Sequence, residues 1–249
     1  MKSYSAVCEK GPVRETNEDS YDVNILNGCL CMIVADGLGG EVSGEIASKI
    51  AVETLMREFE SNMEALIDEE HIEEFLSAGF NKANKEIIRY GIAHPESQGM
   101  CTTLTAAVQN DNKLYIAHIG DTRAYLCHHR EVQRLTNDHN KAAELVREGK
   151  ITPEEAKVHP GRNVLVKVLG ENVYLKPDFY SYNICCGDIV MLCSDGLYPF
   201  VDKEDFIDAL NHRSNLQIVC QNLVDKAIKA GSSDNLTIVA GLASPNWCK

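Results

Sequence analysis

Aspartate recurs in this sequence at positions where an apolar stretch gives way to a turn. Asp36 and Asp195 each follow an apolar run, and Asp19, Asp121 and Asp234 occupy comparable settings. Any one Asp beside Gly could be explained by the turn itself, because both residues tolerate unusual backbone dihedrals. Five such positions are harder to explain in this way. If the strand ends converge in space, their carboxylates would form one cluster.

Clustered carboxylates suit hard divalent cations. Mg2+ and Mn2+ take oxygen ligands and keep several waters, so a few carboxylates and one backbone carbonyl are enough for two ions. Gly37, next to Asp36, could expose such a carbonyl. Two ions can lower the pKa of a shared water and brace the attacking and leaving oxygens of a phosphate ester. This chemistry would need no covalent enzyme intermediate.

Arg14 lies five residues before Asp19. A planar guanidinium can hold two phosphate oxygens at once while metal ions hold the reacting face. We therefore expect Arg14 to bind substrate and to take part in catalysis together with Asp36. The alternative interpretation is an ordinary surface arginine at the edge of a strand.

Short strands and helices must position these residues. Apolar and β-branched runs bounded by turn formers predict strands, and a 3.6-residue apolar period predicts helices. The expected strands are 4–8, 22–26, 30–35, 104–108, 114–119, 123–127, 179–184, 189–193 and 236–241, with helices after Ser43 and at 71–90, 203–211 and 216–230. The stretch 101–135 favours a meander of three or four strands. Runs of strands and runs of helices favour an α+β fold.

The chain has no internal repeat, low-complexity segment or Pro/Ser-rich linker. Its 249 residues, 44% of them hydrophobic, are enough for one large core. We expect a single domain over residues 1–249. Residues 137–170 differ from the rest, because they contain two short helix signals and a loop with Gly and Pro, and they predict a surface excursion.

The charge balance excludes some classes of partner. Lys and Arg total 24 against 37 Asp and Glu, for a formal net charge of −13, which repels nucleic acid and anionic lipid. No apolar run approaches the roughly 20 residues that span a bilayer, and the first residues lack a signal-peptide pattern. We expect a cytoplasmic protein. Its ten cysteines include no Cys-x-x-Cys pair and are interpreted as reduced thiols.

Six short motifs follow one another in order. They are Gly11-x-Val13-Arg14-x-x-Asn17-Glu18-Asp19, Val34-Ala35-Asp36-Gly37-Leu38-Gly39-Gly40, Gly99-Met100-Cys101-Thr102-Thr103-Leu104, Ile119-Gly120-Asp121-Thr122-Arg123, Ser194-Asp195-Gly196-Leu197 and Gly231-Ser232-Ser233-Asp234-Asn235-Leu236-Thr237. In this order they resemble the metal-dependent protein phosphatases of the 2C type, particularly the bacterial members. The resemblance covers residues 5–242 and implies hydrolysis of phosphoserine and phosphothreonine monoesters by a metal-activated water.

The resemblance also implies a ligand set for two Mn2+ or Mg2+ ions. Asp36 would bridge both ions, and the Gly37 carbonyl would join one of them. Asp195 and Asp234 would bind the other ion. Asp19 would bind directly or through water.

Further expectations come from the same resemblance. Asp121 matches a position that contributes to a third, weaker metal site in bacterial relatives, and Glu18 would be a ligand or would accept hydrogen bonds beside one. The implied fold is a sandwich of two antiparallel sheets flanked by helix pairs, with residues 137–170 as a flap beside the site. The implied partners are phosphorylated proteins, including Ser/Thr kinases, and we expect a monomer.

The chain departs from the family pattern in several places. Many eukaryotic relatives carry His at the position of Leu38 as a candidate general acid, and Leu38 cannot donate a proton. His139 is one possible substitute, although it could equally cap a helix or face solvent. Lys167 stands where bacterial relatives often have Arg, and residues 198–200 are bulkier than usual. These two departures bear on substrate preference.

Three other functions compete with the phosphatase. A related fold without activity could serve as a scaffold, but such proteins lose metal aspartates, and here the central ones are present. A metallonuclease would need basic residues to follow a nucleic-acid backbone. A cysteine phosphatase would need a His-Cys-x5-Arg signature, which the sequence lacks.

Overall fold

Two antiparallel β-sheets form the centre of the molecule. The computed structural model describes residues 3–38, 43–62 and 69–243. The first sheet has the order β1-β11-β10-β7-β8 and the second β2-β3-β5-β6-β9, with the short β4 paired to β3. The strands of the first sheet are β1 (Tyr4–Glu9), β7 (Arg123–His128), β8 (Glu131–Arg134), β10 (Ile189–Cys193) and β11 (Leu236–Leu242). Those of the second are β2 (Asp19–Leu26), β3 (Cys29–Leu38), β4 (Cys101–Thr102), β5 (Leu104–Asn110), β6 (Lys113–Ile119) and β9 (Asp178–Asn183).

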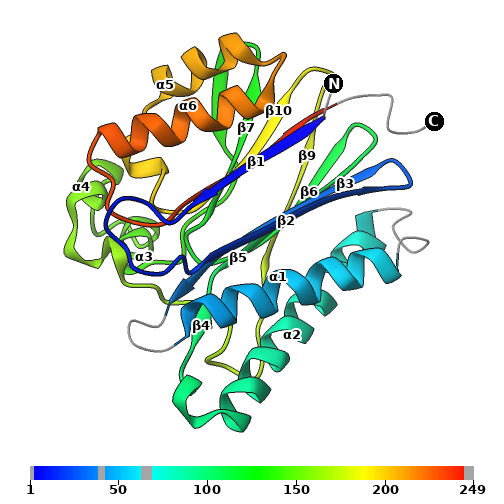
Figure 1. Cartoon of the computed structure of the whole chain (residues 1–249), viewed down its shortest axis with the longest axis vertical. Helices are drawn as coiled ribbons and strands as arrows, with labels where there is room; N and C mark the ends of the chain where they lie inside the picture. The colour runs from blue at the N-terminus through cyan, green and yellow to red at the C-terminus, as the bar shows by residue number, and fades with distance from the viewer. Residues whose placement is uncertain (1–2, 39–42, 63–68, 244–249) are drawn as a thin grey trace.

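A pair of helices covers the outer face of each sheet. Helices α1 (Gly44–Ser61) and α2 (Glu69–Ala93) lie on the second sheet, and α5 (Lys203–Ala209) and α6 (Leu216–Lys229) lie on the first (Figure 1). No helix in the described part of the chain is both long and apolar enough to cross a membrane. The α+β sandwich with flanking helix pairs, predicted from the resemblance, is confirmed.

The layers bury three separate apolar clusters. One lies between α1, α2 and the second sheet, one between α5, α6 and the first sheet, and one between the two sheets. All five residues of β10 are buried because both of its faces are covered. A strand covered on both faces is apolar throughout instead of alternating. The central strands are therefore firmly held at the point where they end in polar residues.

The expected meander over residues 101–135 is wrong. Strands β5 and β6 pair with each other in the second sheet, whereas β7 pairs with β8 and β10 in the first. The chain crosses between the sheets at Gly120, whose φ of 105° is open to glycine but strained for other residues. A local apolar pattern does not reveal that the turn after Ile119 changes sheets. Asp121 thus lies at the crossover between the sheets.

Two predicted boundaries also differ. β2 begins three residues earlier than expected, at Asp19, and β3 continues past Ala35 to Leu38, because Asp19 and Asp36 are opposite each other in the β2–β3 ladder. Ser43 precedes α1 as expected, but its φ is 53° and its side chain makes no cap hydrogen bond. The Ser43 hydroxyl instead lies 2.9 Å from the Ser97 hydroxyl.

Residues 137–170 leave the sandwich and return to it. They contain α3 (Lys141–Arg147) and α4 (Pro153–Val158), both short. Asn140 caps α3, and Thr152 and Glu155 form a capping box at the start of α4. Figure 1 shows this segment at the same end of the sandwich as the loop between β1 and β2.

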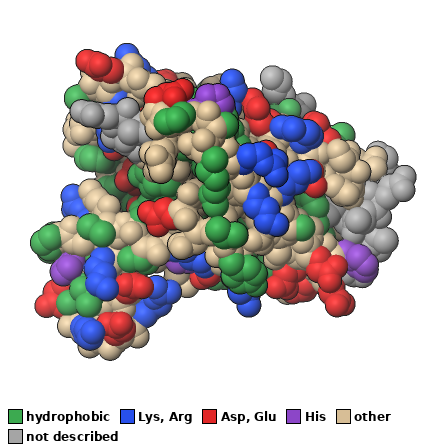
Figure 2. Space-filling view, turned by 90° about the horizontal axis from the view of Figure 1, so that it is seen from below, with side chains coloured by type: hydrophobic (Ala, Val, Ile, Leu, Met, Phe, Trp, Pro, Cys, Tyr) green, Lys and Arg blue, Asp and Glu red, His purple; other side chains and the backbone are tan. Residues whose placement is uncertain are grey.

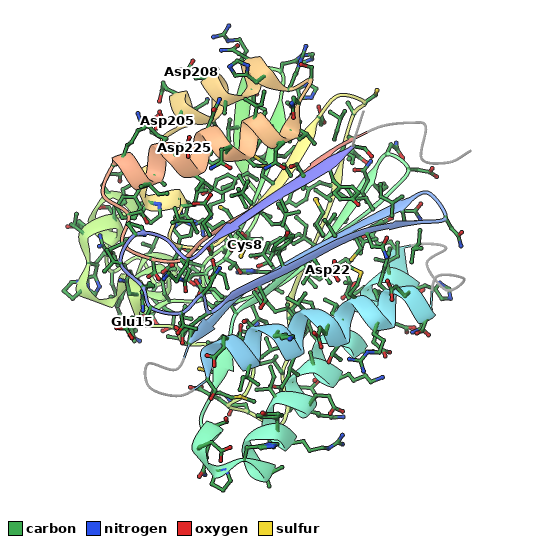
Figure 3. The ribbon with its side chains drawn as sticks, viewed as in Figure 1. Cys8, Glu15, Asp22, Asp205, Asp208 and Asp225 are labelled. Carbon is green, nitrogen blue, oxygen red and sulfur yellow. The ribbon has the colours of Figure 1, made fainter. Side chains whose placement is uncertain are left out.

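The surface carries charges of both signs. Asp205, Asp208 and Asp225, labelled in Figure 3, come from α5 and α6. On the face in Figure 2, Lys and Arg side chains form a patch right of centre and further groups elsewhere, with Asp and Glu side chains among them. The nine cysteines in the described ranges are free thiols, and Cys248 lies outside them.

Candidate active site

Asp19 and Asp36 are brought together by the pairing of β2 with β3. They face each other in the antiparallel register, and Asp19 is 7% exposed. The Ser194 hydroxyl, just beyond β10, donates to Asp19 Oδ2 at 2.7 Å. The same hydroxyl accepts the Thr237 N–H at 3.0 Å, so the two sheets are linked at this point. Asp19 is therefore fixed from both sheets.

The backbone around Asp36 is held on both sides. The Asp36 N–H donates to Thr103 Oγ1, and the Thr103 N–H donates to the Asp36 carbonyl, each at 2.9 Å. Thr102 Oγ1 donates to the same carbonyl at 2.9 Å. A Cβ on Gly37 would lie 2.2 Å from the Gly44 carbonyl oxygen, so only glycine fits there without a backbone shift. Gly39 and Gly40 of this motif lie outside the described residues.

Asp195 and Asp234 lie on two loops that pack closely. Asp195 follows β10, and Asp234 precedes β11. A Cβ on Gly196 would lie 1.9 Å from the Asn235 carbonyl oxygen, so the close approach of the loops requires glycine. Asn235 Nδ2 donates to the carbonyls of Lys10 and Thr16 at 2.9 and 3.0 Å. The Asn235 side chain thus closes the β1–β2 loop over the site.

Asp121 joins the cluster from the crossover between β6 and β7. It is 5% exposed. The residue before it, Gly120, donates its N–H to His139 Nδ1 at 3.1 Å and accepts the His139 N–H through its carbonyl at 2.8 Å. Two hydrogen bonds from one residue therefore set the backbone that carries Asp121.

The carboxylates of these loops act on one another electrostatically. Burial, followed by repulsion from the other aspartates, raises the pKa of Asp36 well above its ordinary value; the repelling residues are Asp19, Asp195, Asp121 and Asp234. Burial, followed by repulsion from Asp195, raises the pKa of Asp121. Burial, followed by repulsion from Asp234, raises the pKa of Asp195. For Asp19 the same causes raise the pKa to about 7. Close, buried carboxylates cannot all ionise without compensation.

Arg14 lies at the rim of this cluster. Its Nη2 donates to Asp234 Oδ2 at 2.8 Å, and its side chain is 48% exposed. It comes from the loop between β1 and β2, in which Glu15 is labelled in Figure 3, and not from the edge of a strand. The alternative placed Arg14 at a strand edge, and that position is wrong, although the side chain is at the surface. An exposed guanidinium beside buried carboxylates has donors left for an anion.

Several predicted residues occupy other positions. His139 neither caps α3 nor faces solvent: it is 3% exposed, its ring lies 4.8 Å from that of His118, and its Nε2 is 3.1 Å from Asp178 Oδ2. Lys167 Nζ donates to Asp178 Oδ1 at 2.7 Å. The Tyr198 ring stacks on the Arg123 guanidinium, 3.5 Å from ring centroid to Cζ.

Sequence reasoning missed the residues that hold the aspartates in place. Ser194, Thr103 and Asn235 make the hydrogen bonds described above. Ser194 and Asn235 stand in the same motifs as Asp195 and Asp234, but a hydroxyl or amide beside a carboxylate gives no sign of its partner. The only signal in the sequence was that these polar residues stand within the motifs. The groups that they bond come from distant parts of the chain.

The donor set fits divalent metal ions. It consists of carboxylates whose pKa is raised by burial and by one another. Within the described residues, one of the five aspartates forms an ion pair with a basic side chain: Asp234 with Arg14. Hard cations that take oxygen ligands would supply the missing positive charge.

Comparison with known proteins agrees with this geometry. Residues 13–230 match the family model described as protein phosphatase 2C. The chain belongs to the protein phosphatase 2C family. It is 34% identical over 233 residues to a serine/threonine phosphatase stp of Listeria monocytogenes, covering 93% of this chain and 92% of that protein. The family predicted from the six motifs is thus confirmed.

Solved structures of phosphatases have the same fold. Serine/threonine phosphatase Stp1 of Staphylococcus aureus has a TM-score of 0.90 at 30% identity, covering 97% of this chain and 95% of that one. The catalytic domain of serine threonine protein phosphatase PstP, in complex with two manganese ions, has a TM-score of 0.82 at 31% identity, covering 97% and 98%. As a member of the protein phosphatase 2C family, this chain is a phosphatase, which is a hydrolase.

Proposed function

We propose that this phosphatase hydrolyses phosphoserine and phosphothreonine monoesters of proteins at a centre for two Mn2+ or Mg2+ ions. One observation carries the proposal: aspartates from distant parts of the chain converge at one end of the sandwich, and burial and mutual repulsion raise the pKa of Asp36. Ionising these buried, mutually repelling carboxylates is unfavourable, and bound cations would compensate their negative charge. The serine/threonine specificity matches that of the named relatives.

Each aspartate has a proposed role. Asp36 would bridge the two ions, the Gly37 carbonyl would complete one of them, and Asp195 and Asp234 would hold the other. Asp19, whose second oxygen already accepts from Ser194, would bind directly or through a water. When bound, the pair of ions would acidify a water and neutralise the charge of the phosphate.

Asp121 has a separate role in this proposal. It would hold a third, weaker ion, at the crossover whose backbone His139 fixes. Its burial and its proximity to Asp195 raise its pKa, so a cation nearby would stabilise its ionised form.

Arg14 would bind the phosphate. Its exposed guanidinium already donates to Asp234, so it is oriented toward the metal centre before substrate arrives. Two parallel N–H donors would then hold two phosphate oxygens and orient the phosphate beside the carboxylates.

The proton for the leaving alkoxide would come from water. Leu38 has no proton to give, and His139 is sequestered between His118 and Asp178. A general acid must lie within hydrogen-bond reach of the leaving oxygen, directly or through one water. We therefore assign the role to water and not to a side chain.

The domain organisation belongs to the same proposal. Residues 1–249 would form one phosphatase domain, with 137–170 as a flap that borders substrate access. The Lys167–Asp178 ion pair at 2.7 Å would anchor the flap to β9. Phosphorylated proteins, including Ser/Thr kinases, would be the substrates, and the protein would act as a monomer in cytoplasmic signalling without binding nucleic acid or membranes.

The test is hydrolysis of a phosphothreonine peptide by the purified chain. Turnover is expected with Mn2+ and should be lost with EDTA, and the variants Asp36→Asn and Asp195→Ala should lose it while keeping their fold by circular dichroism. The surface variant Asp208→Asn, on α5, is the matched control and should keep full activity. Turnover that persists with EDTA would contradict the metal mechanism, and no turnover by the parent protein would favour a binding scaffold instead.

A further inference from the structure

A second group of metal-ligating side chains lies at the other end of β10 from Asp195. His128, Cys185 and Asp188 each offer one ligand atom, and these three atoms lie within 4.8 Å of one another. At about 3.3 Å per residue in an extended chain, the stretch from Asp188 to Asp195 places the two groups roughly 20 Å apart. This group is therefore distinct from the candidate active site.

The sheet and a tight turn bring the three residues together. Cys127 pairs with Ile189 in the β7–β10 ladder, so His128 and Asp188 are neighbours at the ends of these two strands. His128 Nδ1 lies 2.6 Å from Asp188 Oδ1. The Cys185 N–H donates to Asp188 Oδ2 at 2.8 Å, and the Asp188 N–H donates to the Cys185 carbonyl at 3.0 Å.

A further backbone hydrogen bond fixes the turn that carries Cys185. Gly187, with a φ of 90°, donates its N–H to the Ala243 carbonyl at 2.9 Å. The Asp188 side chain is 5% exposed, whereas the His128 side chain is 43% exposed and Cys185 is exposed. The carboxylate is thus fixed, and the two other donors can rotate toward a common point on the open side.

The donor types select the class of ion. A thiolate, an imidazole and a carboxylate are the ligands of Zn2+, while Mg2+ and Mn2+ prefer oxygen alone. Zinc bonds of about 2.0 Å to nitrogen and oxygen and about 2.3 Å to sulfur require ligand atoms closer than the 4.8 Å limit. Small rotations of His128 and Cys185 would supply this approach.

We propose that His128, Cys185 and Asp188 form a binding site for Zn2+, with water in the fourth position. Binding would release the thiol proton of Cys185, because a thiolate is the form that binds the ion. The ion would join the end of β7 to the turn before β10, so it would stabilise this end of the first sheet. It would leave hydrolysis at the distant centre intact.

Cobalt provides a probe that separates this site from the active site. Co2+ takes the place of Zn2+ in such sites, and a thiolate ligand gives it a near-ultraviolet charge-transfer band. The five aspartates of the active site hold oxygen donors and cannot produce that band. Titration of CoCl2 into the reduced, metal-free chain should therefore produce the band, and equimolar ZnCl2 should abolish it.

Variants assign the ligands. The band should be lost in Cys185→Ser, and cobalt affinity should fall at least about tenfold in His128→Ala, by analogy with losses around metal ligands. The neighbours of the same chemistry serve as controls: Cys186→Ser and His129→Ala should keep the band, as should Cys248→Ser. Retained Mn2+-dependent hydrolysis in every variant would show that the fold is intact.

Three outcomes would overturn the proposal. The parent protein could give no charge-transfer band, in which case the group is only an ion pair that holds the turn. The band could persist in Cys185→Ser, or it could vanish in Cys186→Ser while Cys185→Ser retains it. Either of the last two results would place the thiolate elsewhere.

Discussion

Replacing Asp19 by Asn should stabilise the metal-free protein more at pH 8 than at pH 6. Asp19 is 7% exposed, and burial is the main cause that raises its pKa from 3.8 to about 7. A carboxyl whose pKa is higher in the folded state holds its proton more tightly there. Its contribution to stability is full below pH 3.8 and is lost as the pH rises through 7. Asparagine does not ionise, so the variant escapes this loss.

The size of the effect follows from the titration. Between pH 6 and pH 8 the folded-state carboxyl changes from mostly protonated to mostly ionised, while the unfolded-state carboxyl is ionised throughout. A pKa near the middle of this interval gives a loss of about 1.4 kcal/mol. For a chain of this length, 1 kcal/mol corresponds to about 2–4 °C in Tm. The Tm difference between variant and parent should therefore grow by about 3–6 °C.

The comparison must be made between variant and parent, because buried histidines act in the opposite direction. Burial lowers the pKa of His118 to about 3 and lowers that of His139 as well. A histidine held neutral in the folded state loses stability as the pH falls below its unfolded pKa of about 6.5. That loss would mask the Asp19 effect in the parent alone. It is common to both proteins and cancels in the difference.

Thermal unfolding with EDTA at pH 6, 7 and 8 is the assay. Added Mn2+ should raise the Tm of the parent more than that of Asp19→Asn, because the proposed ligand is the ionised carboxylate. A Tm difference that is the same at pH 6 and pH 8 would refute the reasoning, since Asp19 would then not be held among other buried carboxylates. A difference that shrinks at pH 8 would refute it as well.

Three further changes test the proposed roles. Asp36→Asn should lower kcat for a phosphothreonine peptide at least about a hundredfold, because the proposed metal ligand would support several kcal/mol of transition-state stabilisation; an unchanged kcat would remove Asp36 from the proposed centre. Arg14→Lys should raise KM about tenfold, because the paired N–H donors of the guanidinium are lost while the positive charge remains. Initial rates over a range of peptide concentrations measure KM, and an unaltered KM would contradict the prediction. His139→Leu should lower the free energy of unfolding by about 1–3 kcal/mol in urea, because the Gly120 N–H loses its acceptor. The pH profile of kcat should keep its shape, and a lost limb would make His139 the general acid.

The aspartates could be predicted from sequence, whereas the residues that hold them could not. Asp36 and Asp195 stand out because each follows an apolar run, and such runs predict buried strands. Nothing in the sequence pairs Ser194 with Asp19, because the hydrogen bond joins strands of different sheets. Partners of this kind depend on topology, which the local pattern does not contain.

The same limit explains the wrong meander and the uncertain histidine. β6 and β7 follow each other closely, and only the three-dimensional packing separates them into two sheets. The sequence left His139 open as a general acid, a helix cap or an exposed side chain, and its burial against His118 and Asp178 follows from that crossover. The crossover at Gly120 gives His139 a structural role, because its ring accepts the Gly120 N–H.

The buried strands that carry the aspartates explain how the fold tolerates several carboxylates close together. Mutual repulsion of buried carboxylates favours an expanded site, so the elements that carry them must resist separation. Asp36 extends a strand with a buried core, Asp195 follows the fully buried β10, and Asp234 precedes β11, which pairs with β10. Apolar burial on both faces of these strands opposes the repulsion. The carboxylates can therefore keep their arrangement in the metal-free protein, and the energy of binding the proposed cations need not be used to assemble them.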